Sequence, residues 1–286
     1  MALLEVTAVT GLSVVAGTTV TALLCVGPRQ VSRAVTDADD RLREVAPYLG
    51  AALALLAAKQ LTQGYRLRLS RALDWNITDE LYAFEGGFVA TLQRLTPEAT
   101  LEFFTVSYVI GFAFLLVAPA VLYFLSGRTG QRRLKELLVA YMLNYAVGTV
   151  CYTLFVSYGP RNHLETVSGL MYRVYPQTQD LTAAVASNTN VFPSLHTSLS
   201  VAVLAVAWRS RRTHPRWTPV AAVVAAAVVY STMYLGIHWL VDVVVGVALG
   251  VGSVSAAARI VDRAESRFTA ADYDEWRGQP DHAGDD

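Results

Sequence analysis

The chain has 286 residues, of which 53% are hydrophobic and only 16% are charged, and its mean hydropathy is +0.37. Soluble domains carry roughly a quarter charged residues, so this composition excludes an ordinary soluble domain and predicts a membrane protein. The 23 basic and 23 acidic residues cancel, which excludes the strongly basic character typical of nucleic-acid-binding proteins.

Seven apolar runs are candidate membrane spans. They cover residues 3–26, 45–61, 101–125, 137–156, 191–208, 219–237 and 239–261. The predicted fold class is therefore an all-α, polytopic membrane helix bundle. The first run lacks the basic flank and the clear cleavage site of a signal peptide, so we expect it to be retained as a span. The second run is the shortest, which leaves six or seven spans in total.

Basic residues predict the orientation of these spans. The third run is followed by Arg128, Arg132, Arg133 and Lys135, and the fifth by Arg209, Arg211, Arg212 and Arg216. Because short cytoplasmic loops are enriched in Lys and Arg, both segments are predicted to lie in the cytoplasm. Residues 158–190 and the start of the fifth run are then extracytoplasmic, and the C-terminus is cytoplasmic.

The chain divides into four predicted segments. Residues 1–61 hold the N-terminal spans, 62–100 an extracytoplasmic interfacial segment, 101–261 the membrane core and 262–286 a disordered, acidic cytoplasmic tail. The stretch DELYAFEGGFVATLQRL at 79–95 alternates apolar and polar residues at roughly helical spacing. This pattern is typical of a helix along the membrane surface, and equally of a solvated loop helix.

Ionisable groups at the membrane boundary are costly, so they mark candidate functional sites. In GIHWLVDVVVG, residues 236–246, His238 and Asp242 are four residues apart, which predicts that they share one face of a helix. A carboxylate that accepts a hydrogen bond from one imidazole nitrogen leaves the other nitrogen free to act as a nucleophile or base.

A second cluster lies in VFPSLHTSLS, residues 191–200, on the same predicted side of the membrane. It offers His196, the Ser194 hydroxyl and free backbone N–H groups at a helix start near Pro193, which together favour an anion. Arg161, in SYGPRNH, could bind a phosphate through two hydrogen bonds. These groups are the ones that phosphoryl transfer needs.

The motifs PSLH at 193–196 and STMYLGIHWLVD at 231–242 resemble two signatures of the type 2 phosphatidic acid phosphatase superfamily. FPSLH together with TMYLGIHWLVDVVVG more closely resembles its inositolphosphotransferase branch, which includes the inositol phosphorylceramide synthases. The resemblance implies a six-helix phosphatase-type core, with residues 101–261 as the catalytic membrane core, plus an extra N-terminal span.

The resemblance also implies a mechanism. His238 would attack phosphorus in a lipid-linked phosphate substrate, Asp242 would orient His238, and His196 would protonate the leaving oxygen and then activate the acceptor. Ser194 and Arg161 would bind the phosphate, and no metal or other cofactor would be needed. A water acceptor makes such an enzyme a phosphatase, and a hydroxyl acceptor makes it a transferase.

Two departures favour the synthase-like branch. The phosphatase branch has an arginine directly after the serine of its third signature, whereas Thr232 follows Ser231 here. Its first signature has lysine, then arginine and proline, whereas this chain offers GPR at 159–161. Arg161 is therefore the predicted substitute for the missing basic residue.

Two other functions remain open at this stage. A zinc-dependent membrane hydrolase would use His163, His196, His238 and Asp242 as ligands. A non-catalytic protein that binds a lipid or another anion would use the same groups without turnover. The sequence specifies neither the donor lipid, the acceptor nor an oligomeric state.

Overall fold

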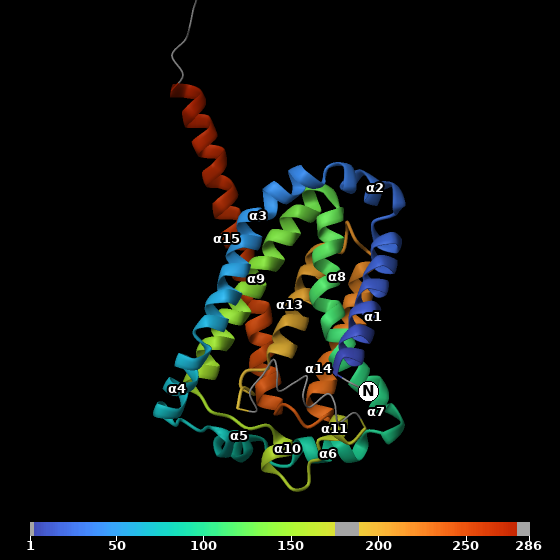
Figure 1. Cartoon of the computed structure of the whole chain (residues 1–286), viewed down its shortest axis with the longest axis vertical. Coiled ribbons are helices and arrows are strands. Elements are labelled where there is room, and N and C mark those ends of the chain that lie inside the picture. Colours follow the sequence, from blue (N-terminus) through green and yellow to red (C-terminus); the bar gives the residue numbers. More distant parts are fainter. Residues whose placement is uncertain (1–2, 175–188, 279–286) are drawn as a thin grey trace, which may run out of the picture.

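The structure is a computed structural model that describes residues 3–174 and 189–278, which form a bundle of long helices with short helices across one end (Figure 1). The long helices are α1 (Leu3–Cys25), α3 (Ala38–Leu61), α8 (Phe112–Leu125), α9 (Gly127–Leu154), α13 (Leu195–Arg209), α14 (Trp217–Tyr234) and α15 (Leu240–Gly278). Strand-like pairing in the described ranges is limited to two isolated bridges, Asn76–Val156 and Ser157–Asn190. The predicted all-α fold class is confirmed.

Each predicted apolar run contributes to a long helix, although not every helix has the length of a span. Five segments are long and apolar enough to cross a membrane: Glu5–Cys25, Glu98–Leu125, Gly127–Leu154, Trp217–Tyr234 and Leu240–Ser266. A sixth candidate is the pair of helices α3 and α4 (Gln63–Leu73), which are bent relative to each other by 57°. At 15 residues, α13 rises only about 22 Å, less than the ~30 Å hydrocarbon core. These helices make the chain an integral membrane protein.

The segment Glu98–Leu125 is continuous but not uniform. It consists of the 3-10 turn η1 (Glu98–Thr100), α7 (Leu101–Val106), the π-helical turn η2 (Ser107–Gly111) and α8. π-helical turns inside α-helices often mark functional sites. Tyr108 in η2 and Phe112 at the start of α8 both contact the candidate site described below.

The helix α13 lies inside the bundle, packed against α8, α9, α14 and α15. Its contact with α15 is the closest, because α15 presents glycines: a Cβ on Gly246 would lie 2.7 Å from the Ser194 carbonyl oxygen, and one on Gly250 would lie 2.5 Å from that of Ser198. Membrane helices associate largely through such van der Waals packing of small residues. The two helices that begin at the candidate site thus touch backbone to backbone.

Short helices cover one end of the bundle: α5 (Thr78–Glu85), α6 (Phe88–Leu95), α10 (Pro160–His163) and α11 (Leu170–Val174) (Figure 1). Hydrogen bonds attach them to the bundle, for example from the Gln93 side chain to the carbonyl oxygens of Ser168 and Tyr234 at 2.8 and 2.9 Å. The stretch 79–95 forms α5 and α6, separated at Gly86, whose φ of +62° suits glycine.

The opposite end of the bundle carries a network of charged groups. Glu136 on α9 is fully buried and accepts hydrogen bonds from Arg133 at 2.5 and 2.7 Å and from Arg209 on α13 at 3.3 Å. Lys135 contacts Glu44 on α3 at 2.7 Å and Glu265 on α15 at 3.2 Å. This is the end that the basic loops predict to be cytoplasmic, and that orientation stays a prediction.

Two predicted boundaries change. The helix that contains run 45–61 begins at Ala38, because Arg41, only 9% exposed, donates a hydrogen bond to the Phe124 carbonyl oxygen at 2.9 Å and so packs a polar turn against α8.

The disorder predicted from residue 262 is corrected as far as Gly278, where α15 ends. Asp262 and Glu265 bind Arg132 and Lys135 of α9, which anchors the helix. Residues 279–286 lie outside the described residues.

Candidate active site

His238 lies in the short connection between α14 and α15, not on a helix. Gly236, with φ of +72°, ends α14, and the backbone N–H groups of Ile237 and His238 both donate to the Thr232 carbonyl oxygen at 3.0 Å. Since α15 begins only at Leu240, the prediction that His238 and Asp242 share a helix face is wrong. The loop nevertheless returns the imidazole toward the first turn of α15.

Asp242 joins the helix start to His238. Its Oδ2 accepts the Trp239 backbone N–H at 2.8 Å, a capping interaction, and lies 3.4 Å from His238 Nδ1. Asp242 is fully buried and His238 is 4% exposed. Asp242 Oδ1 and His238 Nδ1 are buried without a hydrogen-bond partner, so an approach of a few tenths of an ångström would complete the pair.

His196 occupies the first turn of α13 and faces His238, with the two ring centroids 6.3 Å apart. Its ring stacks on Tyr108, with the ring centroids 4.4 Å apart, and lies 4.2 Å from the Phe112 ring, tilted by 41°. These aromatic contacts fix the plane of the His196 imidazole. The structure therefore brings together the two histidines that the sequence placed about forty residues apart.

Ser194 caps α13. Its Oγ accepts the Thr197 backbone N–H at 3.3 Å, and its own backbone N–H donates to the Asp242 carbonyl oxygen at 3.2 Å. The residue is fully buried, so its hydroxyl serves first as a helix cap. The proton of that hydroxyl can still be donated, and the N–H groups of Leu195 and His196 begin the helix without intrahelical acceptors.

Arg161 lies beside the His238 loop. Its backbone N–H donates to the Gly236 carbonyl oxygen at 3.1 Å, and its guanidinium lies 4.6 Å from the centre of the Tyr172 ring. Arg161 Nη1 is buried and has no hydrogen-bond partner. Burial and, after it, the positive charge of Arg161 lower the pKa of His238 to about 3, so the imidazole is neutral at physiological pH.

His163 takes a different position from the other histidines. Its Nε2 lies 3.7 Å from Asp79 Oδ1, and its ring packs on Tyr82 and Trp239. Within the described ranges, no three His, Cys, Asp or Glu side chains form a group that could hold a metal ion. The zinc hypothesis therefore finds no ligand set in this part of the chain.

Glu85, at the end of α5, is a site residue that the sequence reasoning missed. Its Oε2 accepts the backbone N–H of Val241, 156 residues later in the chain, at 3.2 Å, and its Oε1 is buried without a partner. An acidic residue in an amphipathic loop helix carries no local signal of such a contact. Tyr108 and Phe112 were missed because aromatic residues within an apolar run are expected to pack in the core.

Comparison with known proteins places these observations in a family. Residues 84–256 match the model of the PAP2 superfamily. The crystal structure of Aquifex aeolicus LpxE is similar, with 20% identity and a TM-score of 0.48, over 62% of this chain and 95% of that chain. None of the curated proteins matches the chain. The family match spans more than half of the 286 residues and includes all five predicted site residues, from Arg161 to Asp242. The chain belongs to the PAP2 superfamily.

Proposed function

We propose that the protein is a membrane enzyme that removes or transfers the phosphoryl group of a lipid-linked phosphate through a phosphohistidine on His238. The observation that carries the proposal is the buried His238–Asp242 pair, 3.4 Å apart, which faces His196 across 6.3 Å between ring centroids. Membership of the PAP2 superfamily agrees with lipid phosphatase chemistry.

In the first step, Asp242 holds a proton on His238 Nδ1, and Nε2 attacks phosphorus. The new N–P bond forms as the bond from phosphorus to the leaving oxygen breaks, and His196 gives a proton to that oxygen. Arg161, the Ser194 hydroxyl and the first backbone N–H groups of α13 stabilise the charge on the phosphoryl oxygens. Burial keeps the attacking imidazole of His238 neutral, as a nucleophile must be.

In the second step, His196 takes a proton from the acceptor, whose oxygen attacks the phosphohistidine. A new P–O bond forms, the N–P bond breaks and His238 is regenerated. Water as acceptor gives phosphatase activity, and a lipid or sugar hydroxyl gives phosphotransferase activity. The signature-like FPSLH and TMYLGIHWLVDVVVG stretches, with Thr232 in place of arginine, favour a hydroxyl acceptor of the inositolphosphotransferase kind.

The proposal places the site on the extracytoplasmic side and uses no metal ion. The orientation is supported by the basic residues at the start of α9 and in the α13–α14 connection, which lie at the end of the bundle away from His238. Metal independence is supported by the donors already present, because a guanidinium and helix N–H groups can neutralise phosphoryl oxygens.

The test incubates the purified full chain with dioleoyl phosphatidic acid or dioleoyl phosphatidylinositol, with and without a diacylglycerol of different acyl chains as the acceptor, in the presence of EDTA. Mass spectrometry follows inorganic phosphate and new phosphate-bearing lipids that carry the acyl chains of the acceptor, and acid-labile phosphate on the protein is measured after denaturation. We expect His238→Ala to abolish the acid-labile label, and Asp242→Asn and His196→Ala to lower turnover by about 10²- to 10⁴-fold.

His163→Ala is the matched control, because a zinc site would use His163 and the phosphohistidine mechanism does not. It should retain most of the turnover. Full activity in His238→Ala would overturn the mechanism, and loss of activity in EDTA would point to a metal enzyme. Tight lipid binding without any turnover by the wild-type protein would identify a non-catalytic binding protein.

A further inference from the structure

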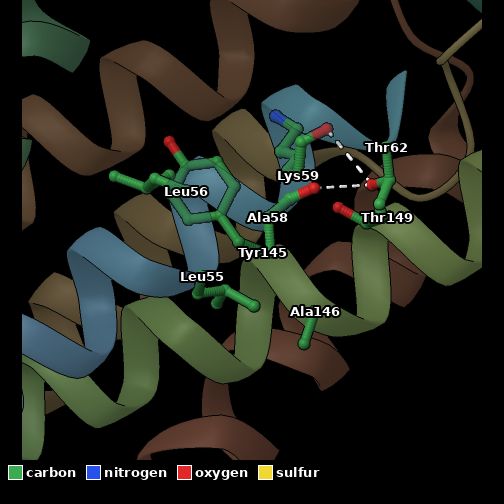
Figure 2. Close-up of a pocket in the computed structure, with 8 residues that line it drawn as sticks. All are labelled: Leu55, Leu56, Ala58, Lys59, Thr62, Tyr145, Ala146 and Thr149. Atoms are coloured by element: carbon green, nitrogen blue, oxygen red, sulfur yellow. Dashed lines mark hydrogen bonds between the residues drawn. The ribbon is translucent and has the colours of Figure 1, made fainter. Parts of the chain in front are cut away.

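A groove of about 240 Å³ lies between α3 and α9, away from the histidines (Figure 2). Its walls are mostly apolar, with Leu55 and Leu56 from α3 and Ala146 from α9. Leu56 is 44% exposed, so the groove opens on the outer surface of the bundle, which faces lipid in a membrane. A groove of this kind accommodates an acyl chain.

The polar groups of the groove gather at the end where α3 turns into α4. Lys59 Nζ lies 5.1 Å from the centre of the Tyr145 ring, and Lys59, Thr62 and Thr149 lie at this end in Figure 2. Because α4 bends back by 57°, Arg66 reaches the same place, where its guanidinium donates to the Lys59 carbonyl oxygen at 2.7 Å and to Thr62 Oγ1 at 3.3 Å.

These two cations lack acidic partners. Lys135, the other lysine of the chain, pairs with Glu44 and Glu265, whereas no carboxylate of the described residues lies within 4.0 Å of the Lys59 ammonium or the Arg66 guanidinium. Two positive charges beside an apolar groove are complementary to a molecule with an apolar chain and an anionic head. Basic residues near a membrane surface attract anionic lipids.

We propose that the groove between α3 and α9 binds an anionic phospholipid. One acyl chain lies against Leu55, Leu56 and Ala146, and the phosphate lies on Lys59 and Arg66. The cationic end of the groove is at the α4 end of α3, the end of the bundle covered by the short helices, so the phosphate sits at headgroup level (Figure 1). The site is separate from His196 and His238 and does not depend on the proposed phosphoryl transfer.

The test is native mass spectrometry of the full chain in detergent, titrated with phosphatidylglycerol or phosphatidylcholine that carry identical acyl chains. We expect the wild-type protein to retain phosphatidylglycerol with a Kd about tenfold below that for phosphatidylcholine. Lys59→Gln combined with Arg66→Gln should reduce this preference to about threefold or less. Ala146→Phe fills the apolar part and should weaken the binding of both lipids.

The matched control is Arg68→Gln, because Arg68 is an exposed arginine two residues from Arg66 on the same helix. It removes a positive charge outside the groove and should leave both Kd values unchanged. An unchanged lipid preference in the double variant, or an equal loss in Arg68→Gln, would overturn the proposal. Displacement of phosphatidylglycerol by millimolar inorganic phosphate would also overturn it, because the site would then bind free phosphate.

Discussion

Glu85 on α5 accepts the backbone N–H of Val241, in the first turn of α15, at 3.2 Å. This contact ties the short helices over the end of the bundle to the helix that carries Asp242. A carboxylate at a helix N-terminus also complements the helix dipole. Burial, with a smaller contribution from the nearby Asp242, nevertheless raises the pKa of Glu85 to about 7.

The first prediction concerns the pH dependence of stability. The pKa of Glu85 is about 7 in the folded protein and 4.5 in its ordinary state, so between these values the folded protein binds more protons. Its contribution to stability is therefore full below pH 4.5 and is lost as the pH rises toward 7. Glu85→Gln keeps an acceptor for the Val241 N–H without this titration. The melting temperature of the variant minus that of the wild type should therefore increase as the pH rises from 4.5 to 7.

Thermal unfolding in detergent over this pH series measures the difference between variant and wild type. Glu80→Gln is the control, because Glu80 is exposed on the same helix. Parallel pH profiles for wild type and Glu85→Gln would contradict the assignment.

The second prediction concerns the aromatic residues that hold His196. Tyr108→Phe keeps the ring that stacks on His196 at 4.4 Å, so turnover should change little. Tyr108→Ala frees the imidazole, and a misplaced acid costs about 10- to 100-fold in kcat. Steady-state phosphate release should show a lower kcat with little change in KM. A loss of equal size in both variants would mean that the hydroxyl, and not the stacking, matters.

The third prediction concerns the close approach of the Arg161 loop to the His238 loop. A Cβ at Gly159 would lie 2.2 Å from the Ile237 carbonyl oxygen, so Gly159→Ala must push the two loops apart. Overpacking of this kind costs about 1–3 kcal/mol. We expect a lower melting temperature and a weaker binding of phosphate-bearing lipid. Gly252→Ala, whose Cβ would meet nothing within 4 Å, should be neutral or stabilising.

The fourth prediction concerns the other end of the bundle. Glu136→Gln removes the fully buried carboxylate that binds Arg133 and Arg209, and because both arginines are partly exposed, loss of these charged hydrogen bonds costs about 1.5–3 kcal/mol. Asp40→Asn removes an exposed partner of Arg43, worth about 1 kcal/mol at most. Thermal unfolding should separate the two variants clearly. Similar melting temperatures would show that Glu136 does not stabilise the fold.

The sequence predicted the membrane bundle because apolar composition largely determines whether a helix can lie in lipid. It predicted the helix boundaries less well. Hydropathy ends a span where polar residues begin, yet α3 starts at Ala38, since Arg41 finds an acceptor on α8. The acidic residues after 261 suggested disorder, but Asp262 and Glu265 find basic partners on α9. Both differences come from tertiary partners, which composition does not reveal.

For the site, the motifs identified His196, His238, Asp242, Ser194 and Arg161, and the structure gathers them at the start of α13 and α15. A four-residue spacing suggested a shared helix face for His238 and Asp242, but Gly236 ends α14 and leaves His238 in a loop. Glu85 could not be predicted, because its contact with Val241 joins segments 156 residues apart. Local sequence patterns indicate which residues are candidates for the site, but they do not predict which distant segments of the chain contact those residues.

The glycine contacts between α13 and α15 have a consequence for substrate choice. With no side chains between the two backbones at Gly246 and Gly250, α13 and α15 are in direct contact there. Under the proposed mechanism the two histidines therefore keep their spacing, and a bulky substrate is accommodated by the surrounding helices. Headgroup and chain-length preference should then change through substitutions in those outer helices, while the spacing of the two histidines stays constant.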